Sequence, residues 1–379
     1  MKIVHVFKDA YPPLVAGITR YIADLSSEFV ARGHEVSVVV AGVKTSRVDI
    51  ESDGVRIVRC AELGRALSMP LSPELANTIR RESCDVIHVH MPNPIGEWGV
   101  LRRGGDVAHV VTFHAQLGKQ RVLAPLYSPL QSAVLKRASR VLVSSSAMSQ
   151  VSELKAAHEV GNVEVLPFGV SPKLIGSTVA RDDRPSGSPM RLLFVGRLVY
   201  YKGIEVLLDA LEQIENCTLT VVGEGPLGEM VERRCEGELS GRVTWLRGVD
   251  DDALRLVYAD HDVFVLPSVS RAEAFGLAMA EGMANGLAVV STRLQTGTDW
   301  VNEHGASGLV VEPGSVSQLT AALRELQADP ELRQRLASGA RTRALTHMSF
   351  THHADAIEAI YCRASGIAPD LSGQERRAA

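Results

Sequence analysis

Short runs of β-branched and other apolar residues alternate along this chain with segments whose apolar positions recur at helical spacing. In the first half, such runs occur at residues 3–7, 35–40, 55–58, 86–89, 110–113, 141–144 and 163–166. Because nearly every position in them is apolar, they are typical of strands that a parallel sheet buries on both faces. Between the first two runs, apolar residues from Ile18 to Phe29 fall on one helix face, and Gly33 then signals the end of that helix. The pattern predicts repeated β-α-β units.

The alternation stops in a polar segment rich in Gly, Pro and Ser, residues 176–189, and then begins again. In the second half, apolar runs follow at residues 191–195, 219–222, 243–246, 263–266, 288–291 and 309–311. Strands that alternate with helices in this way favour an α/β fold in which each half is a doubly wound parallel sheet. We therefore predict two domains that face a central cleft, with ligands bound at the carboxyl ends of the strands.

The polar segment has the composition of a linker, and it sets the predicted domain boundaries. Residues 1–180 are expected to form the first domain, and residues 190–348 the second. We expect residues 349–364 to form a C-terminal helix that could pack back on the first domain, and residues 365–379 to form a flexible tail.

Composition narrows the class of protein. The chain has 379 residues, of which 45% are hydrophobic and 22% charged, as in a globular protein with an ample core. A formal net charge of −4 argues against a general nucleic-acid-binding protein. The five cysteines are scattered without a C-x-x-C pattern, so we expect reduced thiols in a cytosolic protein. The sequence shows neither a membrane-spanning apolar run nor the pattern of a signal peptide.

The densest group of candidate functional residues opens the second half, in the segment V-G-R-L-V-Y-Y-K-G at residues 195–203. A predicted strand ends at Val195, and Gly196 permits a tight turn before the next predicted helix. Arg197 and Lys202 therefore lie near backbone N–H groups and a helix N-terminus, which together favour the binding of a diphosphate. A solvated basic loop is the alternative interpretation of this segment.

Two glutamates, Glu273 and Glu281, stand eight residues apart in the segment 271–286. We expect Glu273 at the start of a helix, so that eight residues span about 12 Å and return to nearly the same helix face. Two carboxylates placed in this way can hold separate hydroxyl groups of one extended ligand, such as a sugar and a ribose. The alternative is that Glu273 only favours a helix N-terminus and that Glu281 is solvated.

Three other patterns have simpler explanations. His88 and His90 share one strand face, but no third ligand stands at a suitable spacing, so we expect structural histidines rather than a metal site. The acidic run 250–252 precedes a predicted helix, where aspartate caps the helix N-terminus. The glycines at 223–228 formally match a dinucleotide-binding pattern, and we interpret them as a loop that shapes a nucleotide cleft.

Taken together, these segments resemble the retaining glycosyltransferases of family 4, whose GT-B fold consists of two Rossmann-like domains. In the second half, the resemblance rests on the Glu-x7-Glu spacing, the G-R-L-x3-K-G segment and the V-G-E-G-P loop at 222–226. In the first half, it rests on Y-P-P-x3-G-I at 11–18, A-R-G-H-E-V at 31–36, T-F-H at 112–114 and V-S-S-S at 143–146. The matches occur in the order of the family and cover about residues 1–360.

The resemblance implies a role for each matching residue of the second half. Arg197 and Lys202 would neutralise the diphosphate of a nucleotide-sugar donor as the glycosyl bond breaks. Glu281 would hold the nucleotide ribose, and Glu273 the hydroxyl groups of the donor sugar. Sugar and phosphate would also meet the backbone N–H groups of Phe275, Gly276 and Leu277.

In the first half, the resemblance implies that Gly17 lets backbone N–H groups approach the diphosphate. His114, at the end of a predicted strand, would contact the transferred sugar or the acceptor; taken alone, it reads as a structural histidine. The family often has a Gly-Gly pair where this chain has Ala16-Gly17. The resemblance implies no catalytic metal and no cofactor, since the nucleotide sugar is a substrate. We therefore expect the catalytic residues to be Arg197, Lys202, Glu273 and His114.

The stretch 291–311 bears on the donor sugar. It contains T-G-T-D-W-V-N in place of a more usual Gly-Gly-x-x-Glu pattern. In this it looks like bacterial exopolysaccharide and O-antigen mannosyltransferases, which implies GDP-mannose as the donor and a polyprenyl-diphosphate-linked oligosaccharide as the acceptor. The alternative is a loop variant without meaning for the donor.

A basic amphipathic segment, residues 118–140, bears on membrane contact. Its cations are Lys119, Arg121, Lys136, Arg137 and Arg140. The first 185 residues also contain 22 Lys/Arg against 18 Asp/Glu, a net charge of 22 − 18 = +4. Such a segment could touch an anionic membrane, while an ordinary surface helix is the alternative. We expect a cytoplasmic protein that could bind peripherally to the inner face of the cell membrane.

We therefore predict a retaining hexosyltransferase that acts on a glycan or lipid-linked oligosaccharide in cell-surface polysaccharide synthesis. One alternative is a transferase that uses a UDP-sugar (glucose or N-acetylglucosamine) and a small-molecule acceptor. A nucleotide-sugar epimerase on the same fold would act without an acceptor, and a Rossmann oxidoreductase would change nicotinamide absorbance. A non-catalytic nucleotide-sugar-binding protein would release no nucleotide when an acceptor is added.

Overall fold

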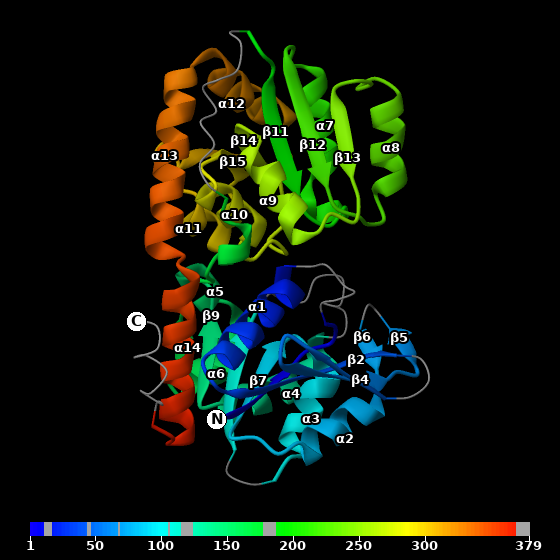
Figure 1. The fold of residues 1–379 in the computed structure, drawn as a ribbon, viewed down its shortest axis with the longest axis vertical. Helices are drawn as coiled ribbons and strands as arrows, with labels where there is room; N and C mark the ends of the chain where they lie inside the picture. Colours follow the sequence, from blue (N-terminus) through cyan, green and yellow to red (C-terminus); the bar gives the residue numbers. More distant parts are fainter. Residues whose placement is uncertain are drawn as a thin grey trace. The chain divides into compact units, whose positions relative to one another are not determined.

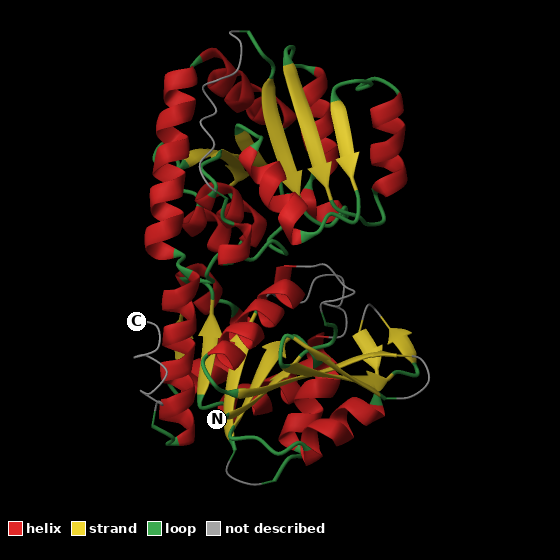
Figure 2. Cartoon of the chain, viewed as in Figure 1, coloured by secondary structure: helices red, strands yellow, loops and turns green. Residues whose placement is uncertain are grey.

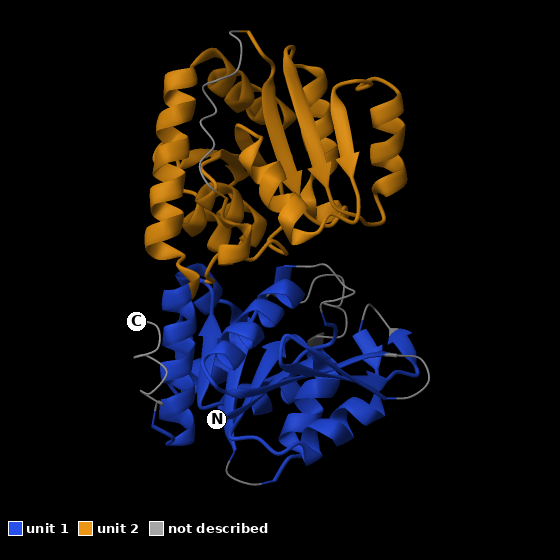
Figure 3. Cartoon of the chain, in the orientation of Figure 1, with its two compact units in different colours: residues 1–167, 351–379 blue, residues 168–350 orange. Residues whose placement is uncertain are grey.

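The computed structural model describes residues 1–10, 17–43, 47–66, 69–104, 107–114, 124–176 and 187–368. The chain forms two compact units, residues 1–167 with 351–379 (unit 1) and residues 168–350 (unit 2), shown in Figure 3. The division falls at Pro167, earlier in the chain than the predicted boundary at residue 180. The predicted linker and the predicted tail lie mostly outside the described residues.

Unit 1 is built on an eight-stranded sheet in the order β10-β9-β8-β7-β1-β2-β4-β3 (Figures 1 and 2). The apolar runs correctly predict its parallel strands, which are β1 (Lys2–Val6), β2 (Glu35–Val43), β4 (Val55–Ala61), β7 (Val86–Met91), β8 (Ala108–Phe113), β9 (Arg140–Val143) and β10 (Val163–Val165). Every residue of β7 and β8 is buried. The strand order reverses between β1 and β7, which makes the carboxyl ends of these strands the expected ligand position.

The apolar pattern misses three short strands of unit 1. β3 (Val48–Ser52) pairs antiparallel with β4 at the sheet edge, and β5 (Gly64–Ala66) and β6 (Met69–Leu71) form a separate hairpin. β3 is mostly exposed and therefore lacks a continuous apolar run. The sequence signal for β3 is the Asp-Gly pair that joins it to β4. Asp53 and Gly54 both have positive φ, as a tight Asp-Gly hairpin turn requires.

The helices of unit 1 are α1 (Gly17–Ala31), α2 (Pro73–Arg81), α3 (Pro94–Leu101), α4 (Ala124–Arg137), α5 (Ser146–Ser149), α6 (Lys155–Glu159) and, from Thr351 onward, α14 (Phe350–Ser365). Helix α14 is held in unit 1 by buried polar contacts. The Tyr21 hydroxyl on α1 lies 2.8 Å from Nε2 of His353, and the Tyr361 hydroxyl lies 2.6 Å from Nδ1 of His88 on β7. The C-terminal helix is therefore part of the core of unit 1.

Unit 2 repeats the architecture with a six-stranded parallel sheet in the order β13-β12-β11-β14-β15-β16. The strands are β11 (Met190–Val195), β12 (Cys217–Val222), β13 (Val243–Leu246), β14 (Val263–Leu266), β15 (Ala288–Thr292) and β16 (Gly308–Val311). The helices are α7 (Ile204–Glu212), α8 (Gly228–Glu236), α9 (Asp251–Ala259), α10 (Leu277–Ala284), α11 (Gly297–Val301), α12 (Val316–Ala328) and α13 (Pro330–His347). Here the order reverses between β11 and β14. In the described part of both units, no helix has both the length and the apolar character that crossing a bilayer requires.

Candidate active site

The two predicted cations of unit 2 lie in the connection that follows the central strand β11. This strand ends at Val195, and a single helical turn covers Tyr200–Lys202 just before α7. The side chain of Lys202 is mostly buried, and its Nζ lies 2.5 Å from Oε2 of Glu273. Arg197 is exposed, and its side chain forms no hydrogen bond or ion pair with any residue that the structure describes. Both cations thus lie at the carboxyl edge of the sheet, one fixed by a carboxylate and one exposed.

The groups around Lys202 keep its side chain charged. Burial alone would lower the pKa of Lys202, because desolvation penalises the ammonium form. The Glu273 carboxylate outweighs this effect together with Tyr201 and the more remote carboxylate of Glu281, so that the pKa of Lys202 is raised. Both predicted glutamates therefore act on one ammonium group.

The structure corrects the predicted placement of Glu273 at the start of a helix. Helix α10 begins only at Leu277, after Gly276 has adopted a left-handed conformation with φ of 82°. An L side chain is strained in that conformation, so glycine is required where the chain enters the helix. Glu273 lies in the preceding loop and does not share a helix face with Glu281.

Polar groups from neighbouring segments hold the Glu273 loop in place. The hydroxyl of Ser268, just after β14, donates to Glu273 Oε2 at 3.1 Å. The hydroxyl of Thr296, which caps α11, donates to the Glu273 carbonyl at 2.8 Å. Thr296 opens the T-G-T-D-W-V-N stretch that the sequence links to the donor sugar, so this stretch supports the Glu273 loop. Sequence reasoning missed Ser268, whose signal is a polar residue after a buried strand.

The entry into α10 offers backbone donors. The N–H groups of Phe275, Gly276 and Leu277 have no acceptor among the described residues. Helix N-termini leave such groups unpaired, and they attract anions. The Phe275 side chain, in contrast, is buried against Phe168 and Trp300, with ring centroids 5.3 and 6.2 Å away. A ligand would therefore meet the backbone of Phe275 and not its ring.

Glu281 lies inside α10 and is buried. The hydroxyl of Tyr258, on α9, donates to its Oε2 at 2.6 Å. The carboxylate that the resemblance assigns to the ribose is therefore oriented by a tyrosine that sequence reasoning missed. Tyr258 follows Leu254 by one helical turn on the buried face of α9, a position that reads as ordinary core.

The glycine motif at 223–228 allows close packing beside the cation loop. A Cβ on Gly223 would overlap the Gly196 carbonyl oxygen, and one on Gly225 would lie 2.5 Å from the Leu198 carbonyl oxygen. These glycines let the loop after β12 rest on the loop that carries Arg197. The packing explains the glycines without a dinucleotide.

The acidic run 250–252 caps a helix, as predicted. Asp250 precedes α9, and its Oδ1 accepts a hydrogen bond from the N–H of Ala253 at 2.8 Å. The next two aspartates occupy the first turn, where negative charge is favourable.

In unit 1, one predicted site residue begins a helix and the other directly follows a strand. Gly17 is the first residue of α1 and is exposed, while Ala16 and the Y-P-P segment lie outside the described residues. His114 follows β8 directly and is 3% exposed. Its backbone N–H donates to the Met91 carbonyl at 3.2 Å, and its Nε2 lies 2.9 Å from Nδ1 of His90.

His114 ends a row of three buried imidazoles. His90 Nε2 lies 3.1 Å from Nδ1 of His5 on β1, so the rings of His5, His90 and His114 are linked in series. Burial lowers the pKa of His5 and of His114 to about 3, and that of His90 well below its usual value. The row is therefore neutral at physiological pH.

The structure supplies the third histidine that sequence reasoning did not find near His88 and His90. His5 lies opposite His88 in the β1–β7 register, and ligand atoms of all three lie within 4.8 Å of one another. However, the His90 ring stacks on those of His88 and His5, with centroids 4.3 and 5.3 Å apart. The nitrogens of His88 already lie 2.6 and 2.7 Å from the hydroxyls of Tyr361 and Thr112. Stacked rings do not converge on a tetrahedral metal, so the geometry favours hydrogen-bonded histidines.

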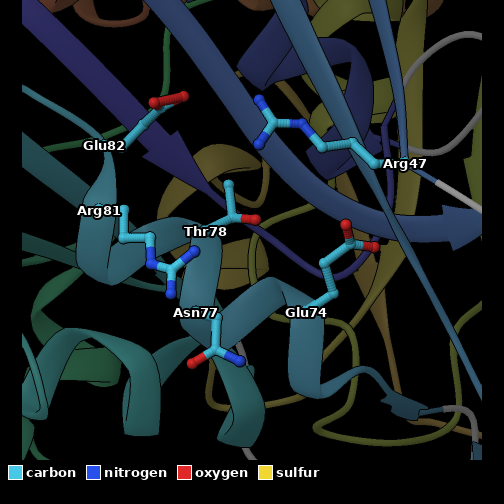
Figure 4. A pocket seen from close by; sticks show the side chains of 6 residues that line it. All are labelled: Arg47, Glu74, Asn77, Thr78, Arg81 and Glu82. Atoms are coloured by element: carbon cyan, nitrogen blue, oxygen red, sulfur yellow. The ribbon is translucent and has the colours of Figure 1, made fainter.

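A cavity of about 380 Å³ lies beside α2 in unit 1 (Figure 4). Its lining residues are Arg47, Glu74, Asn77, Thr78, Arg81 and Glu82. Two of its acids are engaged, since Glu82 accepts from Arg56 at 2.5 Å and Glu74 accepts from the N–H of Ala61 at 2.6 Å. None of the sequence-predicted site residues lines this cavity.

The described part of the basic segment 118–140 forms α4 and the start of β9. Lys136 pairs with Glu159 at 2.8 Å, and Arg137 donates to the carbonyls of Leu101 and Arg103 at 3.1 and 3.0 Å. Lys119 and Arg121 lie outside the described residues. These internal partners are typical of a surface helix packed on its own unit, which was the alternative to membrane contact.

Comparison with known proteins identifies both units. Residues 180–343 match the family described as glycosyl transferases group 1, and residues 16–169 match the glycosyl transferase 4-like domain. An O-antigen chain mannosyltransferase C of Escherichia coli is 29% identical over 371 residues, 95% of this chain and 98% of that protein. A D-rhamnosyltransferase of Pseudomonas aeruginosa is 29% identical over 354 residues, 90% of this chain and 91% of that protein. The structure of a sucrose-phosphate synthase from Thermosynechococcus elongatus has a TM-score of 0.79 at 22% identity and covers 97% of this chain and 100% of its own.

Two Rossmann-like units with these matches define an enzyme that transfers a hexose, a glycosyltransferase of the GT-B fold. The chain belongs to the family 4 type, with a 4-like domain at its N-terminal end and a group 1 domain in the second half. The predicted fold class, family and enzyme class are confirmed. The site residues stay predictions.

Proposed function

We propose that this glycosyltransferase transfers mannose from GDP-mannose, with retention at the anomeric carbon, to a growing cell-surface polysaccharide. The observation that carries the proposal is the ion pair between Lys202, in the connection that follows the central strand of unit 2, and Glu273, in the loop before α10. Nζ of Lys202 lies 2.5 Å from Oε2 of Glu273. A charged ammonium beside a carboxylate offers partners to a diphosphate and to a sugar hydroxyl in one place. The O-antigen mannosyltransferase and D-rhamnosyltransferase relatives support a mannose-like sugar, because rhamnose is mannose without one hydroxyl group.

In the proposed reaction, the bond between the anomeric carbon and the diphosphate oxygen breaks, and GDP leaves with the electron pair. The acceptor hydroxyl bonds to the same face of the sugar, and its proton passes to the departing diphosphate oxygen. Arg197 and Lys202 stabilise the negative charge that develops on the diphosphate. Oε2 of Glu273 accepts from Lys202 and Ser268, so its other oxygen is assigned to the sugar hydroxyls and not to a covalent intermediate.

The remaining predicted residues complete the donor contacts. Glu281, oriented by Tyr258, takes the ribose hydroxyls, and the N–H groups at 275–277 take sugar and phosphate oxygens. In unit 1, Gly17 admits the diphosphate to the start of α1, and His114 contacts the transferred sugar or the acceptor.

We propose further that catalysis needs no divalent metal. The support is that Lys202 has a raised pKa and is held in place by a carboxylate, so a fixed cation is already available to the leaving group. Activity should therefore survive exhaustive treatment with EDTA. Full loss that added Mg²⁺ or Mn²⁺ restores would contradict this part of the proposal.

The acceptor is proposed to be a glycan, in its lipid-linked form a polyprenyl-diphosphate oligosaccharide, met at the cytoplasmic membrane face. The support is the name of the E. coli relative and the resemblance in 291–311. Vesicle sedimentation with and without anionic lipid tests the membrane part, with Lys119→Ala/Arg121→Ala as the variant and Lys136→Ala as its control. Equal binding to neutral and anionic vesicles would contradict it.

A thermal-shift panel of GDP, UDP, ADP and their sugars tests the donor directly. A true donor raises the melting temperature by mass action, and we expect GDP and GDP-mannose to do so most. Transfer to a synthetic lipid-linked acceptor, followed by NMR of the product anomer, then tests retention. A rise in melting temperature with UDP-sugars alone would show that the donor is not GDP-mannose. A β-linked product from the α-linked donor would contradict retention.

A further inference from the structure

Gln295, in the loop between β15 and α11, has an unusual backbone conformation. Its φ is 55°, in a region that residues other than glycine rarely enter. Two other non-glycine residues of the described chain have positive φ, namely Asp53 and Asn216. Both are of the types that tolerate this region best, because their short polar side chains can form local hydrogen bonds. Glutamine lacks this advantage, so the conformation of Gln295 needs support from its surroundings.

The carboxylate of Asp299 supplies that support. Its Oδ1 accepts from the N–H of Leu294 and its Oδ2 from the N–H of Gln295, both at 3.0 Å. Asp299 belongs to the T-G-T-D-W-V-N stretch that the sequence links to the donor sugar. Backbone strain of this kind persists only where the surrounding structure over-determines it, and it clusters at ligand sites. The strain therefore suggests that the position of the Gln295 side chain matters for function.

The Gln295 loop is bonded to the loop that carries Glu273. The strands before the two loops, β15 and β14, are parallel neighbours, so both loops lie at the carboxyl edge of the sheet of unit 2. Beyond the hydroxyl contact to the Glu273 carbonyl described above, the N–H of Gly297 donates to the Ala274 carbonyl at 2.8 Å. The two loops are therefore held together next to the residue assigned to the donor sugar.

Arg271 determines which end of the Gln295 amide is free. Nη1 of Arg271, in the Glu273 loop, donates to Oε1 of Gln295 at 3.4 Å. A guanidinium can only donate, so the amide turns its oxygen toward Arg271 and its NH2 group away. Both side chains are exposed, and the NH2 group has no acceptor among the described residues. An oriented neutral donor is thus available on a loop that is bonded to the Glu273 loop.

We propose that Gln295 determines the specificity for the donor sugar, with its Nε2 group donating to one hydroxyl oxygen of that sugar. Arg271 is a positioning residue that orients the amide. The inference rests on the proposed function, in which Glu273 holds other hydroxyl groups of the same sugar. A neutral NH2 group suits an uncharged hydroxyl oxygen, so the stretch 291–311 acts on the choice of sugar through this side chain.

Gln295→Glu separates this role from a merely structural one. The carboxylate keeps an oxygen for Arg271 and strengthens that contact, but it cannot donate to a sugar. We compare GDP-mannose with analogues that each lack one hydroxyl group of the mannose. The variant should lower kcat/KM for GDP-mannose about tenfold and leave it unchanged for the analogue that lacks the bonded hydroxyl, because one neutral hydrogen bond is lost. Wild-type values for all donors would overturn the proposal.

Gln295→Gly is a second variant, which keeps the test decisive if Gln295→Glu fails to fold. Glycine adopts positive φ without strain, so we expect the same loss of sugar preference without a fall in melting temperature. Asn216→Gly is the matched control, because it changes another residue with positive φ, directly before β12 and thus at the opposite edge of the sheet. Its sugar preference should equal that of wild type.

A double-variant comparison tests the role of Arg271. Arg271→Ala should weaken the sugar preference of the wild-type enzyme but add nothing in the Gln295→Gly background, because Arg271 acts only through the amide. Additive losses would contradict a positioning role.

Failure of this proposal and failure of the proposed function can be told apart. An equal fall in kcat/KM for every sugar, or a smaller GDP-induced rise in melting temperature in the Gln295 variants, would overturn this proposal while GDP-mannose remained the donor. If the thermal-shift panel identifies another nucleotide sugar, the same comparison with analogues of that sugar still tests Gln295. Absence of transfer from any nucleotide sugar would contradict the proposed function and, with it, this proposal.

Discussion

The two units share one architecture but treat buried polar groups in opposite ways. In the described chain, seven buried histidines belong to unit 1, against one, His261, in unit 2. At the carboxyl edge of its sheet, unit 1 has neutral imidazoles in series, whereas unit 2 has the ion pair of Lys202 and Glu273. The same scaffold therefore carries linked neutral imidazoles at the edge of one sheet and a fixed ion pair at the edge of the other.

The largest expected effect comes from removing the charges of unit 2. The double variant Arg197→Ala/Lys202→Ala should lower kcat/KM by roughly a thousandfold, because the leaving diphosphate loses both cations. Steady-state kinetics with the donor found in the thermal-shift panel measures this. Turnover close to wild type would show that the diphosphate does not bind there.

The single variants separate catalysis from stability. Lys202→Ala leaves the Glu273 carboxylate mostly buried without its cation, which should also cost about 3 kcal/mol of the free energy of unfolding. Arg197→Ala should lower activity without changing the melting temperature, because Arg197 is exposed. Equal loss of stability in both would contradict the distinction between a fixed and an exposed cation.

Acid should destabilise unit 1 more than unit 2. Burial lowers the pKa of His5 and His114 to about 3 and that of His109 and His353 to about 4, below the usual 6.5. Below pH 6.5 these histidines therefore bind protons in the unfolded chain but stay neutral in the folded chain. The free energy of unfolding is full above pH 6.5 and decreases as pH falls toward the folded-state pKa values. At pH about 5.5, each such histidine should lower the free energy of unfolding by about 1.4 kcal/mol.

The tryptophans allow this difference to be measured within one chain. Trp245→Phe/Trp300→Phe leaves Trp98 as the reporter of unit 1, and Trp98→Phe leaves the two reporters of unit 2. Denaturant titrations followed by fluorescence should show that acid lowers the free energy of unfolding more when Trp98 is the reporter than when Trp245 and Trp300 are. An equal pH dependence for both reporters would contradict the comparison.

Glu97 should oppose the histidines within unit 1. It is buried on α3, accepts from the Tyr127 hydroxyl at 2.5 Å, and burial raises its pKa from 4.5 to about 7. The folded chain therefore holds a proton that the unfolded chain releases, so this stabilisation is full below pH 4.5 and is lost as pH rises through about 7. In wild type, Glu97 should therefore lower the free energy of unfolding by about 3 kcal/mol as pH rises from 4.5 to 7, and Glu97→Gln should abolish this decrease. An unchanged slope of stability against pH would contradict it.

The smallest effect should come from the cap of α9. Asp250→Ala removes the acceptor of the Ala253 N–H and should cost about 1 kcal/mol of stability with kcat unchanged. Thermal denaturation and an activity assay on the same sample measure both. A large loss of activity that excess metal reverses would instead indicate that the acidic run binds a metal.

The sequence predicted much of the fold because strands and helices leave local signals. The parallel strands of both sheets appear as apolar runs, and Asp250 shows its role by standing before a helix. The strand β3 was missed because an exposed edge strand lacks such a run. Glu273 was wrongly placed in a helix, because the left-handed Gly276 that delays α10 looks like any other glycine in the sequence.

The sequence by itself determined which chemical groups are available and on which kind of element most of them stand. The tertiary structure alone decided their partners, since Lys202 meets a carboxylate from a distant loop and His5 meets a histidine 85 positions away. The physical reason is that periodicity reports only neighbours along the chain. The order and register of parallel strands are set by packing of the whole sheet, and they bring together residues that no spacing connects.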